Sequence, residues 1–167
     1  MRRGELSAPD GDVLAHRYEL ADARLTAAGL RWYEVSNWAR PGGECRHNLG
    51  YWDGGQWWGA GPGAHGYVGA TRWWNVKHPN AYAELVAGAT LPVAGFEQLG
   101  ADALHTEDVL LKIRLRQGLP MSRLDSAERE RAKVVLADGL LATEGDRLVL
   151  TDRGRLLADA VVRTLLG

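Results

Sequence analysis

The fold class is decided by residues 126–151, which read SAERERAKVVLADGLLATEGDRLVLT. Ser126 can cap a helix that runs to Leu136, because its hydroxyl can accept a bond from an unpaired amide of the first turn. Residues 140–151 then alternate between apolar and polar side chains on either side of the turn Glu144-Gly145-Asp146. This pattern predicts a β-hairpin directly after the helix.

Two further helices flank this stretch. Apolar residues recur at helical spacing in residues 99–115 and again in residues 152–166, and Gly118-Leu119-Pro120 is typical of a turn. The resulting order of helix, helix, hairpin and helix is that of a winged helix. Such a domain either binds DNA or serves as a packing module. Residues 97–167 carry 11 basic and 12 acidic side chains, so we favour packing and expect no nucleic-acid partner.

The N-terminal part predicts a single α/β unit. Asp10 or Asp12 can cap a helix that runs to about Ala28 and ends at Gly29. Residues 30–36 then form an apolar strand, and the apolar face of the helix comprises Val13, Leu14, Tyr18, Ala21 and Leu25. One such unit cannot bury both faces of its strand, so we expect the chain to be the end of a larger α/β protein.

Composition divides the chain and excludes several classes of protein. All 13 aromatic residues lie between Tyr18 and Phe96, which places a boundary near Pro92–Gly100. Cys45 is the single cysteine, which excludes an internal disulfide and a cluster held by three thiolates of this chain. No apolar run approaches the ~20 residues of a membrane-spanning helix, and Met1–Gly4 does not lead into a signal-peptide core. We expect a cytoplasmic protein.

The first candidate site is the run ECRHNLGYW at residues 44–52. His47 and Cys45 can bind a metal strongly, and Tyr51 and Trp52 add flat apolar surface nearby. An imidazole beside aromatic walls suits a haem iron and its macrocycle. The alternative is structural, with His47 bonded to a backbone carbonyl and the aromatic rings in the core.

Two further motifs follow this run. The glycine-rich loop Gly59–Gly66 follows a predicted strand at residues 56–61, and it either lets the backbone approach a ligand or forms a tight turn. Arg72 and Lys77 flank the pair Trp73-Trp74 and could receive the propionates of a porphyrin, or the pair could be core with solvated charges around it. Pro79 predicts the first residue of a helix through Ala87.

The motifs at residues 44–52, 59–66 and 72–79, together with the stretch before them, occur in the order found in the radical-SAM haem chaperones, the HemW family. The chain resembles the C-terminal half of these proteins. This family is similar to oxygen-independent coproporphyrinogen III oxidase. The stretch before the motifs is YEVSNWARPG at residues 33–42, and the winged-helix-like tail also resembles the family's C-terminal domain. The resemblance implies a mixed α/β (α+β) fold. Residues 1–95 would be the end of a partial (β/α) radical-SAM barrel, and residues 96–167 a small winged-helix-like domain.

The resemblance also implies cofactors and site residues. The family's haem-binding box matches His47, Asn48, Tyr51 and Trp52, with His47 as the metal ligand, and contacts to S-adenosylmethionine would fall on Ala39 and His65. Full-length relatives hold a [4Fe–4S] cluster on a Cys-x-x-x-Cys-x-x-Cys motif, which this sequence lacks. One cysteine leaves such a cluster under-ligated, so this chain by itself cannot cleave S-adenosylmethionine reductively.

The resemblance therefore leads to one main functional hypothesis. The chain would be the C-terminal part of a haem chaperone that binds haem and passes it to acceptor proteins, and its partners would include the missing N-terminal half of the barrel. The alternative is a fragment of an oxidase that decarboxylates coproporphyrinogen III. An in-frame cysteine motif upstream of Met1 would keep the enzyme possible.

Overall fold

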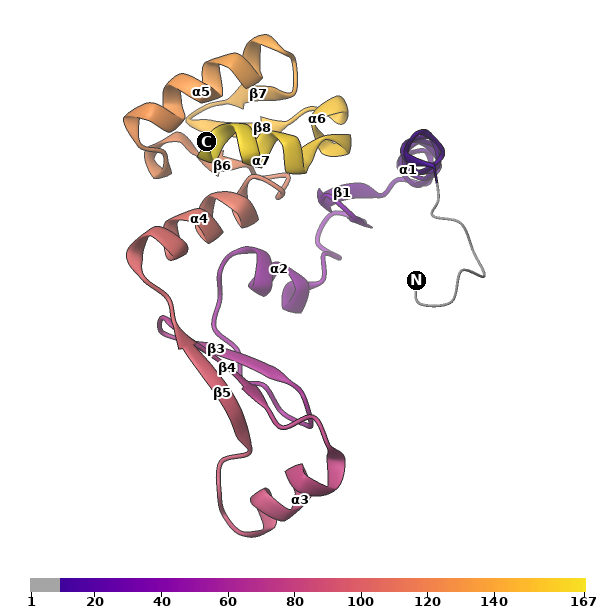
Figure 1. Cartoon of the computed structure of the whole chain (residues 1–167). Helices are drawn as coiled ribbons and strands as arrows, with labels where there is room; N and C mark the ends of the chain where they lie inside the picture. Colours follow the sequence, from indigo (N-terminus) through magenta and orange to yellow (C-terminus); the bar gives the residue numbers. More distant parts are fainter. Residues whose placement is uncertain (1–9) are drawn as a thin grey trace. The chain divides into compact units, whose positions relative to one another are not determined.

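The structure is a computed structural model that describes residues 10–167 (Figure 1). The expectation about Met1–Gly4 lies outside the described residues. The chain divides into two compact units, one formed by the chain up to Arg46 together with Lys112–Gly167 and the other by His47–Leu111. The expected division at residues 95/96 separates a barrel portion from a tail, and it stays a prediction.

Unit one begins with α1 (Gly11–Ala27), as expected. The Asp10 carboxylate accepts hydrogen bonds from the backbone N–H groups of Asp12 and Val13, and Gly29 adopts φ +80° just beyond the helix. The predicted apolar face is only partly covered, since Val13 and Leu14 are 44% and 48% exposed and α1 contains no buried residue. The helix therefore keeps an apolar surface that this chain does not bury.

The predicted strand after α1 is confirmed as β1 (Arg31–Glu34), but its partner was not expected. β2 (Asn37–Ala39) pairs with it in antiparallel register, so the two form a short hairpin. The turn is held by the buried Glu34 carboxylate, which accepts bonds from the backbone N–H and hydroxyl of Ser36 and from the Asn37 amide. Sequence patterning missed β2 because three residues are too few to show an alternation.

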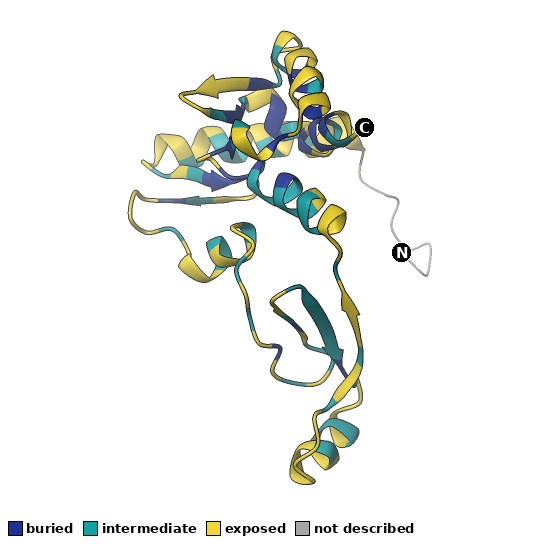
Figure 2. Cartoon of the chain, turned by 90° about the vertical axis from the view of Figure 1, so that its left-hand side faces the viewer, coloured by how far each residue is buried: buried dark blue, intermediate teal, exposed yellow. Residues whose placement is uncertain are grey.

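The C-terminal part of unit one contains the predicted second helix, hairpin and final helical region, together with a strand at Leu119–Pro120, where the sequence predicted a turn. It contains β6 (Leu119–Pro120), the 3₁₀ turn η1 (Met121–Arg123), α5 (Ser126–Ala137), β7 (Leu141–Glu144), β8 (Arg147–Leu150), α6 (Asp152–Leu156) and α7 (Ala158–Leu166). The three strands form an antiparallel sheet in the order β6-β8-β7. The core of this part contains apolar side chains from β8 and from one face of α7, including Leu148, Val161 and Leu165. The buried residues are dark blue in Figure 2.

Two further details of this part differ from the sequence prediction. Asp125, not Ser126, caps α5. Its carboxylate accepts a bond from the Glu128 N–H at 2.7 Å, while the Glu128 carboxylate accepts one from the Asp125 N–H at 2.9 Å. The predicted single helix from Asp152 to Leu166 is broken at Leu157, whose backbone (φ −115°, ψ 23°) separates α6 from α7.

Replacing Asp125 with alanine should lower the free energy of unfolding by about 1 kcal/mol, because the first turn of α5 loses its side-chain acceptor. Urea denaturation measures the loss. Ser126→Ala is the matched control and should leave stability nearly unchanged, whereas the reverse ranking of the two variants would restore Ser126 as the cap.

Unit two is built on a three-stranded antiparallel sheet. Its strands β3 (His65–Val68), β4 (Thr71–Asn75) and β5 (Val93–Gln98) lie in the order β3-β4-β5. The predicted helix at Pro79 is confirmed as α3 (Pro79–Ala87), and the predicted helix over 99–115 is α4 (Ala101–Lys112). α2 (Arg46–Trp52) was not predicted. The predicted strand at residues 56–61 is wrong, since only the single bridge from Trp57 to Tyr67 forms there.

The consecutive residues Trp73 and Trp74 point to opposite faces of this sheet, because side chains alternate along a strand. Each ring lies across a glycine of a neighbouring strand. A Cβ on Gly66 would come within 2.0 Å of the Trp73 ring, and a Cβ on Gly95 within 2.6 Å of the Trp74 ring. The two indoles therefore do not form the core pair considered from the sequence, and each face of the sheet has its own aromatic surface.

Within residues 10–167, no helix is long and apolar enough to cross a membrane. The mixed α/β class expected from the sequence is confirmed, with the paired strands of the described residues all antiparallel.

Candidate functional site

The short helix α2 carries all four residues of the predicted haem box. His47 and Tyr51 are one helical turn apart, as are Asn48 and Trp52, so the four side chains cover one side of the helix. The first pair is exposed and the second pair is half-buried. The imidazole of His47 is therefore open to solvent, which contradicts the structural alternative of a sealed imidazole.

Tyr51 is the immediate neighbour of the imidazole. Its ring stands edge-on to the His47 ring, with centroids 4.9 Å apart and an interplanar angle of 87°. The Tyr51 Oη lies 3.5 Å from His47 Nε2, which is a long and weak hydrogen bond. A ligand that binds His47 Nε2 would therefore break only this weak hydrogen bond.

The aromatic surface extends beyond the box to residues that the sequence did not identify. The Trp57 ring lies 4.7 Å from that of Tyr51, and the Tyr67 ring follows at 5.2 Å from Trp57. Trp57 is fixed in place, since its indole N–H donates to the His65 carbonyl at 3.1 Å and its backbone pairs with that of Tyr67. No local signal could have found this series, because it depends on the pairing of residues 57 and 67.

Arg72 lies at the end of the ring series, 5.9 Å from the centroid of Tyr67. Its guanidinium forms ion pairs with Glu107 at 2.6 Å and with Glu97 at 2.9 Å. The hydrogen bond to Glu107 is the largest influence that raises the pKa of Arg72. A propionate would have to compete with two carboxylates for this side chain, so the exposed Lys77 is the easier contact of the two.

The glycine-rich loop is held by its own neighbours. The buried Asn75 amide donates to the carbonyls of Gly59 and Gly61 at 2.9 and 3.0 Å, and the N–H of Gly61 donates to the Tyr82 hydroxyl at 3.0 Å. A Cβ on Gly59 would lie 2.4 Å from the His65 carbonyl carbon and oxygen. The glycines therefore serve a tight turn, and their backbone N–H groups are not arranged around a phosphate.

The two residues expected to contact S-adenosylmethionine lie in different units. Ala39 is buried in β2 of unit one, whereas His65 is exposed on β3 of unit two, with its ring 6.1 Å from that of Trp74. Their role stays a prediction.

The residues present do not fit an iron–sulfur cluster. Cys45 is exposed just before α2, and no group of three or more His, Cys, Asp or Glu side chains in the described part of the chain could hold a metal ion. An iron ion held here would therefore need further ligands that the described part of the chain does not supply.

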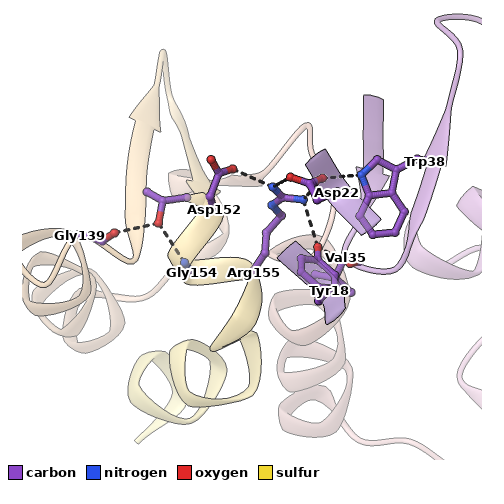
Figure 3. A network of polar contacts seen from close by, with 9 residues as sticks. Tyr18, Asp22, Val35, Trp38, Gly139, Asp152, Gly154 and Arg155 are labelled. Carbon is purple, nitrogen blue, oxygen red and sulfur yellow. Dashed lines mark hydrogen bonds and ion pairs between the residues drawn. The ribbon is translucent and has the colours of Figure 1, made fainter. Parts of the chain in front are cut away.

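A second polar cluster lies in unit one around Arg155 of α6 (Figure 3). The guanidinium donates to both carboxylate oxygens of Asp22 at 3.0 and 2.8 Å, to Asp152 at 2.8 Å and to the Tyr18 hydroxyl at 3.1 Å. Trp38 donates its indole N–H to the same Asp22 at 2.6 Å. These contacts join α1, the β1–β2 hairpin and α6.

Charge and burial in this cluster shift several pKa values. The hydrogen bond from Arg155 lowers the pKa of Asp22, and burial raises the pKa of Tyr18. Burial acts to lower the pKa of Arg155, but the hydrogen bonds to Asp22 and Asp152 outweigh it and hold that pKa above its usual range. Such shifts mark either a reactive site or a structural ion pair. Every carboxylate here is bonded to the same cation, so we assign the cluster to stability.

Sequence comparison gives the family of the chain. It is 86% identical over 167 residues to the heme chaperone HemW of Mycobacterium tuberculosis, covering 100% of this chain and 43% of that protein. It is 32% identical over 175 residues to HemW of Bacillus subtilis, covering 100% of this chain and 46% of that protein. The chain belongs to the HemW family. It matches the C-terminal part of these relatives and spans less than half of their length.

Two further matches carry other names. The mitochondrial radical S-adenosyl methionine domain-containing protein 1 of Bos taurus is 35% identical over 145 residues, covering 87% of this chain and 28% of that protein. The solved coproporphyrinogen III oxidase of Escherichia coli superposes with a TM-score of 0.68 over 99% of this chain and 43% of its own, at 19% identity. This last likeness shows the fold alone. No family model matches the chain.

Proposed function

We propose that this chain provides the haem-binding surface of a HemW-type haem chaperone and holds haem as cargo on α2. The observation that carries the proposal is the exposed His47 imidazole at the end of a continuous series of aromatic rings through Tyr51 and Trp57. An accessible imidazole can ligate haem iron, and flat apolar rings can contact the macrocycle. The names of the HemW relatives support this assignment.

Each box residue has a distinct role in this proposal. His47 is the iron ligand, Tyr51 and Trp52 contact the macrocycle, and Asn48 supports α2 from its half-buried position. The exposed position of His47 also suits a chaperone, because cargo that is to be passed on must be reached by the acceptor. The acceptor is a haem protein, and the rest of the HemW chain is a further partner.

The other cofactors belong to the longer relatives in this proposal. S-adenosylmethionine and a [4Fe–4S] cluster would be held mainly by the part of HemW that this chain does not span, with Ala39 and His65 as contacts to S-adenosylmethionine. We place the protein in the cytoplasm, where a single exposed thiol such as Cys45 remains reduced.

Titration of the purified chain with haem tests the proposal. We expect a shifted Soret band that saturates at one haem per chain, and transfer of this haem to an added apo-globin. Tyr51→Phe should keep the stoichiometry and change haem affinity by less than about threefold, because the hydroxyl contributes only one weak hydrogen bond. A spectrum that equals that of free haem at every ratio would refute the proposal.

A further inference from the structure

Unit two has a second aromatic surface, on the face of the β3-β4-β5 sheet opposite to Tyr67 and Arg72. Here the Trp58 ring packs edge-to-face on Trp73, with centroids 4.8 Å apart and an interplanar angle of 62°. A cavity of about 310 Å³ lies beside these rings. Residues of α3 and residues 89–93 form its other walls. The haem box does not contribute to its walls.

The back of this cavity is closely packed and hydrogen-bonded. Asn75 is 2% exposed and its amide holds two carbonyls of the glycine-rich loop. Gly59 forms part of the wall, and the adjacent His65 carbonyl leaves no space for a side chain there. Trp58, by contrast, is 69% exposed at the rim, so its ring is accessible from solvent. The pocket is thus preformed at its base and open at an indole.

The chemistry of the lining selects for a neutral ligand. No Asp, Glu, Lys, Arg or His side chain lines the cavity. Apolar side chains such as Val86 and Leu91 provide most of the surface. The Tyr82 hydroxyl accepts a hydrogen bond from the Gly61 N–H, so the hydroxyl proton of Tyr82 can be donated to a ligand. Pockets of this size with apolar walls and a few fixed polar groups are typical of small-molecule sites.

We propose that this cavity binds a neutral planar aromatic ligand of one or two fused rings, stacked on Trp58 and bonded through an acceptor atom to the Tyr82 hydroxyl. Haem does not suit the site, because no cation of the lining could meet its propionates. The proposal is independent of the haem function, since it uses the opposite face of the sheet and different residues.

Binding of prodan, a neutral naphthalene ketone, tests this site in the whole chain. We expect one prodan per chain with a blue-shifted emission, and weaker binding of anilinonaphthalene sulfonate, an anionic naphthalene dye. Trp58→Ala should weaken prodan binding about tenfold, because the stacking partner is lost. Leu91→Asp, which brings a charge to the 69% exposed rim, should weaken it similarly.

Phe96→Ala is the matched control. Phe96 is 71% exposed and lies opposite Trp73 on β5, on the same face of the sheet but outside the cavity lining. Its removal should change prodan affinity by less than about twofold. Equal losses in the Trp58 and Phe96 variants would show a general apolar surface and overturn the proposal, as would absence of prodan binding or equal affinity for the anionic dye. Circular dichroism verifies that each variant is folded.

Discussion

Replacing His47 with alanine should remove the shifted Soret band of the haem-bound chain and weaken haem binding by about 100-fold. The imidazole is exposed on α2 and is the iron ligand of our proposal, so its loss would leave only ring contacts to the macrocycle. Changes in the groups that merely orient a metal ligand already cost 10- to 100-fold in affinity, so loss of the ligand itself should reach the upper end of that range. Absorbance titration gives both the band position and the affinity.

His78→Ala is the control for this experiment. His78 is also an exposed histidine of unit two, and its side chain makes no capping bond to α3. The variant should bind haem with the spectrum of the original chain. If His47→Ala and His78→Ala give the same spectrum and affinity, His47 is not the ligand and the haem proposal for α2 fails.

Replacing Asp22 with asparagine should lower the free energy of unfolding by about 3 kcal/mol. The Arg155 side chain is 2% exposed and keeps its charge after the substitution, so it would remain buried without its two-oxygen partner. Removing one member of a buried ion pair is costly because the other charge stays desolvated. Urea denaturation followed by circular dichroism measures the change.

The same contact makes stability depend on pH. Since the hydrogen bond from Arg155 lowers the pKa of Asp22 in the folded chain, the carboxylate stabilises the fold fully above its unfolded-state pKa. That contribution is lost as the pH falls through the lowered folded-state pKa. The original chain should therefore lose stability in acid over this range, and Asp22→Asn should show a flatter profile there.

Asp152→Asn provides the matched comparison, because Asp152 bonds to the same guanidinium nitrogen as Asp22 but is 93% exposed. Solvent screens this pair, so its loss should lie within the error of the measurement. Equal destabilisation by the two substitutions would contradict the assignment of Asp22 as the structural partner of Arg155.

The candidate site was only partly predictable from the sequence. The residues of the box could be named, but the helix that presents them was not expected, because Asn48, Gly50 and two aromatic residues favour helix formation weakly. Trp57 and Tyr67 join the box only through a bridge between residues ten positions apart. The sequence allowed the glycine-rich loop to be either a ligand-binding loop or a tight turn. The hydrogen bonds from the Asn75 amide to the loop carbonyls favour the tight turn.

What the sequence determined by itself is local. The cap by Asp10 or Asp12, the helix at Pro79 and the hairpin about Gly145 each depend on residues within a few positions of one another. All three are confirmed, with Asp10 as the cap. The stretch at residues 33–42 and the motifs at 44–52, 59–66 and 72–79 together indicated the HemW family, which the comparisons show. Caps, turns and short motifs act through neighbouring backbone groups, so a single stretch of sequence is enough to specify them.

Tertiary structure decided everything that joins distant residues. The pairing of β4 with β5 and the contact of Asp22 with Arg155 across 133 positions have no local signal. They depend on which surfaces pack together and on whether a glycine leaves room for a ring, as Gly66 does for Trp73. Steric fit and burial act through space, and residue spacing along the chain does not encode them.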